Sequence, residues 1–156
     1  MRAFIFSSED LRPFETWDKN NYTRNCLFRS QQFELILICW RAGQKTSIHC
    51  HGGEQCWIKM LEGELNEIYY RKNDLDGVDR IGSRLLKNRD HSYIDDRIGL
   101  HQLENSSGEI AMSLHLYAQP IDECSFYNED ERRFFRKRLV YDNSTATIDM
   151  DTVLVG

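Results

Sequence analysis

Short runs of β-forming residues dominate this sequence, and turns rich in Gly, Asn and Asp separate them. The run FELILICW at residues 33–40 is dense in strand-forming types. The segment QCWIKML at residues 55–61 alternates, with Cys56, Ile58 and Met60 on one face. The segments ELNEIYYR, HSYIDD, EIAMSLHLYA and RRFFRKRLVYD continue the series. This pattern predicts an all-β fold, either an antiparallel barrel or a jelly roll.

One helical segment and one tight turn complete the expected fold. Residues 8–17 can form a short N-terminal helix, with Ser8 as its N-cap and Asp10 in the first turn, where the helix dipole favours an acid. The EGE turn at Gly63 suits a tight hairpin, because glycine adopts positive φ at little cost.

Length and charge limit the classes of protein to consider. The chain has 156 residues, enough for one hydrophobic core, and we expect residues 1–156 to form a single domain. Its net charge of −5 argues against nucleic acid and anionic membranes as partners. No run approaches the roughly 20 apolar residues that span a bilayer, and the start MRAFIFSSEDLRPF lacks the features of a secretory signal. We therefore expect a cytoplasmic protein, and we expect it to be a monomer.

The five cysteines do not form a disulfide or zinc pattern. Their number is odd, their spacing is irregular, and no C-x-x-C pair is present. Most of them are expected to be small core residues.

The segment SIHCH, residues 47–51, carries a candidate metal site. In a strand, residues i and i+2 point to the same face, so His49 and His51 project together. Without further context, two such histidines are more often polar residues on an exposed strand. The spacing of Gly43, His49, His51, Cys56 and Gly63, however, resembles the first motif of the cupin superfamily, whose small jelly-roll barrels bind a metal through histidines. Most cupins have a glutamate ligand where this chain has Cys56.

A second segment supplies a third ligand. GLHQLEN contains His101 and Asn105 at the spacing of the second cupin motif, without that motif's usual proline. Three histidines without a carboxylate leave the metal its full positive charge and open positions for a chelating substrate and dioxygen. Imidazole suits iron, zinc, copper and nickel, so the ligand type does not name the metal.

Several motifs in the same order resemble the cysteine dioxygenases, from about residue 11 to residue 124. They are YTRN at 22–25, CW at 39–40, SIHCH, Cys56, DRIGLH at 96–101 and SLHLY at 113–117. The resemblance implies a cupin fold in which His49, His51 and His101 bind Fe(II).

The resemblance also implies roles around the metal. Arg24 would bind the substrate carboxylate, a task that suits the planar guanidinium group. Cys56 would form a thioether crosslink with the ring of Tyr117. The remaining positions would be Tyr22 beside the substrate, Trp40 in the pocket wall, and a hydrogen-bonded relay of Ser113 and His115 that orients the tyrosine.

The implied reaction, a step of cysteine catabolism, is the oxidation of L-cysteine by O2 to cysteine sulfinate. One alternative is a dioxygenase that acts on 3-mercaptopropionate, a group that tends to lack the arginine and the crosslinking cysteine. Another is a non-catalytic metal-binding cupin, which would have no use for the crosslink. The basic and aromatic segment RRFFRKR at 132–138 could bind nucleic acid, but a solvated edge strand explains it better.

Overall fold

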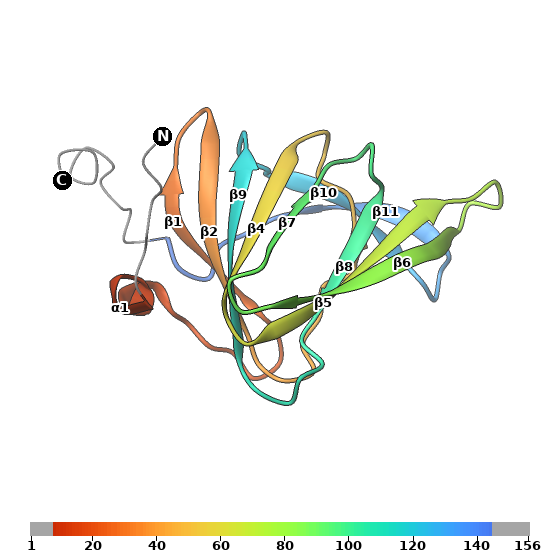
Figure 1. The fold of residues 1–156 in the computed structure, drawn as a ribbon. Helices are drawn as coiled ribbons and strands as arrows, with labels where there is room; N and C mark the ends of the chain where they lie inside the picture. Colours follow the sequence, from red (N-terminus) through yellow and green to blue (C-terminus); the bar gives the residue numbers. More distant parts are fainter. Residues whose placement is uncertain (1–7, 145–156) are drawn as a thin grey trace.

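A computed structural model describes residues 8–144, in which antiparallel strands form a five-stranded and a six-stranded sheet (Figure 1). The strand order is β1-β2-β9-β4-β7 in the first sheet and β11-β10-β3-β8-β5-β6 in the second. This arrangement confirms the predicted all-β fold. The elements are α1 (Ser8–Leu11), the 3-10 helix η1 (Arg12–Phe14), β1 (Thr23–Arg29), β2 (Phe33–Trp40), β3 (Ile48–His49), β4 (Gln55–Glu62), β5 (Glu64–Lys72), β6 (Val78–Lys87), β7 (His91–Ile94), β8 (Leu100–Glu104), β9 (Ala111–Ala118), β10 (Glu123–Asn128) and β11 (Arg133–Arg138).

The N-terminal helical segment is shorter than predicted. Helical structure ends at Phe14 instead of residue 17, and its last turn is a 3-10 helix that contains Pro13. A proline disfavours the α conformation of the residue before it, which explains why α1 stops at Leu11. Glu15 is already extended, with φ −67° and ψ 127°. No helix among residues 8–144 is long and apolar enough to cross a membrane.

Strand β2 is apolar at nearly every position because both of its faces are buried. Ile36 and Ile38 face the interior between the sheets, whereas Leu35 and Leu37 face outward and pack against the N-terminal segment at Leu11. A strand that is covered on both faces reads as a continuous apolar run instead of an alternating one.

The predicted hairpin at Gly63 is wrong, although the positive φ is present. β4 pairs with β7 and β9 in the first sheet, whereas β5 pairs with β6 and β8 in the second. The EGE turn therefore passes the chain from one sheet to the other. Gly63 has φ +70°, and a Cβ there would lie 2.5 Å from the carbonyl oxygen of Ile110. Glycine is required for this crossing because the backbone of another segment approaches so closely.

The register of the first sheet gathers chemically important residues on its inner face. Arg24 on β1 lies opposite Ile38 on β2, which in turn lies opposite Ser113 on β9. Four residues further along β9, Tyr117 lies directly opposite Cys56 on β4. Since residues two and four apart share a face, Ser113 and Tyr117 point the same way.

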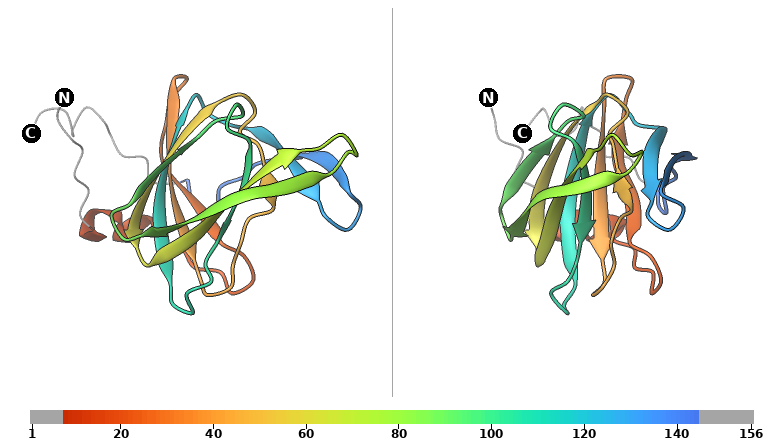
Figure 2. Two further views of the ribbon diagram at one scale, coloured as in Figure 1. Left: turned by 45° about the vertical axis from the view of Figure 1, so that its right-hand side comes forward. Right: turned by 90° about the vertical axis from the view of Figure 1, so that its right-hand side faces the viewer.

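The second sheet carries the histidines of both motifs. His49 on β3 pairs with His101 on β8, so the two motifs meet although the two histidines are 52 positions apart in the sequence. Figure 2 shows the two sheets facing each other, with the β5–β6 and β10–β11 hairpins extending from one end. In the described part of the chain β11 lies at the edge of its sheet and its residues are mostly exposed, which confirms the edge-strand interpretation of RRFFRKR.

Candidate metal centre

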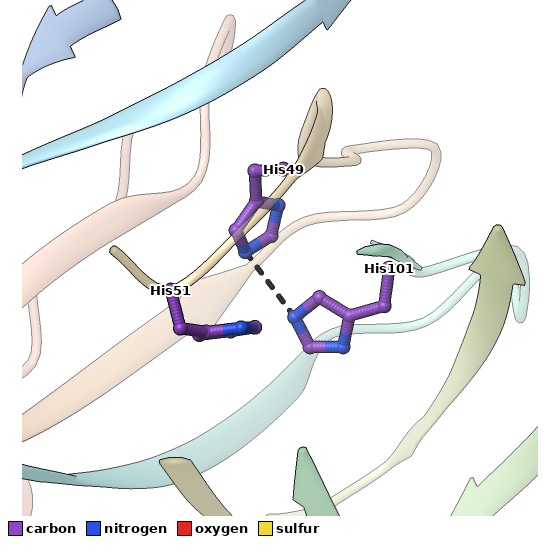
Figure 3. A group of neighbouring side chains, drawn as sticks. All are labelled: His49, His51 and His101. Atoms are coloured by element: carbon purple, nitrogen blue, oxygen red, sulfur yellow. Dashed lines mark hydrogen bonds between the residues drawn. The ribbon is translucent and has the colours of Figure 1, made fainter. Parts of the chain in front are cut away.

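Three histidines converge in the interior between the sheets. His49 and His101 come from paired strands, and His51 follows β3 directly (Figure 3). One ligand atom from each of the three lies within 4.8 Å of the other two. The strand predicted for SIHCH ends at His49, so His51 reaches the group from the loop that follows. Asp96 positions this loop, because its carboxylate accepts hydrogen bonds from the backbone N–H groups of His51, at 2.8 Å, and Gly53, at 2.7 Å.

Hydrogen bonds behind two of the rings direct their other nitrogens toward each other. His49 donates from Nδ1 to the carbonyl oxygen of Ser47 at 2.9 Å, and His101 donates from Nδ1 to Glu67 at 2.8 Å. With both protons on Nδ1, the Nε2 atoms carry lone pairs, and these atoms lie 3.2 Å apart. Metal–nitrogen bonds of about 2.1 Å would separate adjacent ligands of an octahedral ion by about 3.0 Å.

The third ring gives the clearest indication of a metal. His51 is fully buried, and neither of its ring nitrogens has a hydrogen-bond partner. A buried polar group without a partner is destabilising, because water no longer solvates it. A cation held by the three histidines would give one nitrogen of this ring a partner and separate the facing lone pairs of His49 and His101. The three residues therefore fit a metal ion.

The electrostatics of the site favour neutral imidazoles. Burial lowers the pKa of His49, and it lowers the pKa of His51 and His101 well below the ordinary value, with the neighbouring imidazoles adding to the effect. Neutral imidazole is the metal-binding form of histidine.

We expect the metal-free protein to lose stability as the pH falls below about 6.5. Burial lowers the pKa of His51, His101 and His115, whereas the unfolded chain retains the ordinary value of 6.5. The unfolded state then binds more protons below this pH, so each histidine lowers the free energy of unfolding by up to about 1.4 kcal/mol per pH unit. Denaturant titrations at pH 7.5 and 5.5 measure the effect. His115→Gln should weaken this pH dependence, because it removes one of the buried histidines; a slope equal to that of the wild-type protein would contradict the prediction.

The histidines line a small cavity together with residues from the first sheet. The volume of this cavity is about 40 Å³, so it suits a ligand of a few atoms. Among the predicted site residues, the cavity brings together Tyr22, Arg24, His49, His51, His101, His115 and Tyr117.

Arg24 is held from behind and has an unused donor. Its Nη1 donates to the carbonyl oxygen of Val140 at 3.2 Å, and its guanidinium carbon lies 5.5 Å from the centre of the Tyr141 ring. Its Nη2 is buried without a hydrogen-bond partner, and the side chain makes no ion pair within the described residues. An arginine is always charged, so this geometry favours an anionic ligand in the cavity.

Hydrogen bonds connect Ser113 and His115 of the predicted relay with Trp40, whereas the ring centres of His115 and Tyr117 lie 6.3 Å apart. The Trp40 indole donates to Ser113 Oγ at 2.9 Å, and Ser113 Oγ lies 2.8 Å from His115 Nε2. When the proton of neutral His115 lies on Nδ1, the serine hydroxyl donates to Nε2. Burial lowers the pKa of His115 to about 3, so the ring is neutral near pH 7. Trp40 is fully buried behind Tyr22, with the two ring centres 4.8 Å apart, and does not itself line the cavity.

Cys56 and Tyr117 face each other across paired strands. Both are buried, and the neighbouring Tyr117 hydroxyl lowers the pKa of the thiol. Burial nonetheless raises the pKa of Cys56 and also that of Tyr117, so both groups keep their protons near neutral pH. Cys56 is a free thiol in this structure. The Tyr117 ring centre lies 6.3 Å from that of His51, which places its phenol next to the histidines.

Comparison with known proteins identifies the family. Residues 1–130 match the family model of cysteine dioxygenase type I. The chain belongs to the cysteine dioxygenase type I family. It is 35% identical over 133 residues to cysteine dioxygenase type 1 of Bos taurus, covering 83% of this chain and 66% of the relative. The Rattus norvegicus enzyme is 37% identical with the same coverage, so the chain spans slightly less than two thirds of these relatives.

Solved structures support the predicted cupin fold of this cysteine dioxygenase family member. A protein with a double-stranded β-helix domain from Klebsiella pneumoniae has a TM-score of 0.56 at 17% identity, covering 76% of this chain and 91% of its own. A cupin protein from Desulfovibrio desulfuricans has a TM-score of 0.55 at 19% identity, covering 75% and 100% respectively. At these identities the likeness shows the fold alone.

Two residues beside the site of this family member were missed by the sequence predictions. Asp96, which orients the loop after His51, is the first residue of the DRIGLH motif, but that motif was used only to assign His101. Glu67 also gave a sequence signal, because it occupies the same face of its strand as Leu65, where the alternation predicts an apolar residue. An acidic residue at an inward-facing position of a strand indicates that it has a buried hydrogen-bond partner.

Proposed function

We propose that this protein is an Fe(II)-dependent thiol dioxygenase that oxidises L-cysteine with O2 to cysteine sulfinate. The observation that carries the proposal is the buried, unpaired Nη2 of Arg24 beside the three-histidine site in one small cavity. In this proposal a cysteine molecule would bind with its carboxylate at Arg24 and its thiol and amine at the metal. Membership of the cysteine dioxygenase family supports this substrate class.

Each cavity residue then has a role. His49, His51 and His101 would hold Fe(II), which would supply the redox chemistry that joins dioxygen to a thiolate. Arg24 would orient the substrate by two hydrogen bonds to its carboxylate, with Tyr22 beside it. Trp40 would support the pocket wall from behind Tyr22.

Tyr117 would act as a hydrogen-bond donor in this scheme. Burial raises the pKa of its phenol well above the ordinary value, so the hydroxyl keeps its proton and can donate a hydrogen bond into the cavity. His115 would position Tyr117, and Ser113 would in turn fix the tautomer of His115 through their 2.8 Å contact. No external reductant is needed, because the substrate sulfur supplies the electrons.

The decisive experiment is oxygen uptake by the Fe(II)-loaded protein. L-cysteine and 3-mercaptopropionate are run side by side, and sulfinate is quantified against the oxygen consumed. We expect uptake with L-cysteine and one sulfinate per O2. Uptake with 3-mercaptopropionate alone would make that thiol the substrate, and uptake with neither would favour a metal-binding cupin without this chemistry.

We further propose that the enzyme acts in the cytoplasm as a monomer, which the sequence predicts.

A crosslink between Cys56 and Tyr117 is expected to form in active preparations. The two residues lie directly opposite each other on β4 and β9, so a thioether needs no rearrangement of the strands. Oxidation by O2 removes one hydrogen from each side chain, so the intact mass should fall by about 2 Da. Mass spectrometry after incubation with Fe(II), L-cysteine and O2 measures this change. Cys56→Ser should abolish it, whereas Cys26→Ser should not; an unchanged mass in the incubated wild-type protein would contradict the crosslink.

A further inference from the structure

A carboxylate lies directly behind one of the three histidines. Glu67 is fully buried, and its Oε1 accepts a hydrogen bond of 2.8 Å from Nδ1 of His101. Its Oε2 accepts hydrogen bonds from the Tyr69 hydroxyl, at 2.7 Å, and from the Ser92 hydroxyl. A buried carboxylate needs such donors on both oxygens, because it has lost its hydration.

The position of this carboxylate is determined from both sheets. Glu67 and Tyr69 lie two residues apart on β5 of the second sheet, whereas Ser92 lies on β7 of the first sheet. The three hydrogen bonds therefore hold the carboxylate between the sheets, and the carboxylate in turn holds the imidazole ring of His101.

The three histidines are not equivalent in this respect. The Nδ1–H of His49 donates to a neutral backbone carbonyl, and neither nitrogen of His51 has a partner. Among the described residues, only His101 hydrogen-bonds through its ring to an acidic side chain. A carboxylate on Nδ1–H makes the opposite nitrogen more basic and a better metal ligand.

We propose that Glu67 is a positioning residue that fixes the tautomer and orientation of His101 and strengthens its Nε2 as a metal ligand. The three ligands include no carboxylate. Glu67 supplies a negative charge next to the site, through its hydrogen bond to His101. This inference rests on the metal site of the proposed function. It predicts that Glu67 controls the affinity of the site and the reduction potential of bound iron.

The test compares Glu67→Gln with the wild-type protein in metal titrations. Co(II) is added under competition with a chelator, and its visible absorption reports binding. Glutamine keeps the shape and an acceptor for His101 but removes the charge, so Co(II) binding should weaken about 10- to 100-fold. The reduction potential of bound iron should rise, because the lost negative charge stabilised Fe(III) more than Fe(II).

The matched control is Glu34→Gln. Glu34 is also fully buried and also accepts a hydrogen bond from a tyrosine, Tyr141, but it contacts no histidine ligand. The dissociation constant of this variant for Co(II) should lie within about twofold of the wild-type value, because the substituted residue lies outside the metal site. A purely structural role for Glu67 would instead produce similar losses in both variants and leave the potential unchanged.

The outcomes separate this inference from the proposed function. Wild-type affinity and potential in Glu67→Gln would overturn the inference, even if the enzyme oxidises cysteine. Weakened binding in Glu67→Gln with normal binding in Glu34→Gln would support it, even if cysteine were not the substrate. A wild-type protein that binds no metal would overturn both. If Glu67→Gln does not fold, Glu67→Asp provides a second test. Aspartate keeps the negative charge, but its shorter side chain holds the carboxylate farther from His101. Co(II) binding at wild-type strength in Glu67→Asp would then contradict the inference.

Discussion

Replacing Arg24 with glutamine should lower kcat/KM for L-cysteine by roughly 30- to 5,000-fold. The range follows from the 2–5 kcal/mol typical for removing one partner of a buried, charge-assisted hydrogen bond. Among residues 8–144, Arg24 has the only guanidinium that lines the cavity, and its Nη2 has no hydrogen-bond partner. Steady-state oxygen uptake measures the loss.

Cysteamine is the control substrate for this prediction, because it has the thiol and amine of cysteine but no carboxylate. Its turnover should change by less than about threefold in Arg24→Gln, since no ionic contact is lost. Arg24→Lys should recover part of the activity on L-cysteine, because it restores the charge without the planar fork. The exposed Arg41 provides a neutral control, Arg41→Gln. Equal losses with cysteine and cysteamine would show that Arg24 acts on the fold rather than on the carboxylate.

Replacing His51 with alanine should remove metal binding and with it all oxygen uptake. His51 is the informative ligand, because its ring makes no hydrogen bond that the substitution would break. Structural zinc sites contribute about 10–16 kcal/mol through four ligands, so one ligand is worth about 3 kcal/mol, or more than a hundredfold in affinity. Metal content after dialysis and the rise in Tm on adding Fe(II) anaerobically both measure the loss.

The metal-free variant itself should remain folded. Its Tm should lie close to that of the metal-free wild-type protein, whereas only the wild-type Tm should rise when metal is added, since a ligand stabilises the state that binds it. The exposed His91 provides the matched control, His91→Ala, which should bind metal normally. A His51→Ala protein that still retains one metal per chain would contradict the assignment of His51 as a ligand.

Much of the site could be predicted because its residues belong to short local motifs. His49 and His51 lie two residues apart, and Ser113, His115 and Tyr117 occupy every second position of one strand. Strand periodicity determines which of these side chains share a face, whatever the strand pairs with. The resemblance to a known family then assigned roles that periodicity alone left open.

The hairpin prediction at Gly63 failed because local turn chemistry does not determine strand pairing. The EGE turn has the local chemistry of a hairpin, yet β4 pairs with β9 and β7, and β5 with β8 and β6. Turn residues report backbone conformation, and Gly63 does have positive φ. They do not report which strand lies alongside, because pairing depends on contacts between distant segments.

The sequence by itself determined the strand-rich fold class, the local faces of its strands and the histidine, arginine and tyrosine positions of the candidate site. Only the tertiary structure decided how these positions meet: the pairing of His49 with His101, the orphaned nitrogens of His51 and Arg24, and the carboxylate of Glu67 behind the site. The physical reason is that side-chain direction follows from local backbone geometry, whereas burial and hydrogen-bond partners depend on the packing of two sheets against each other.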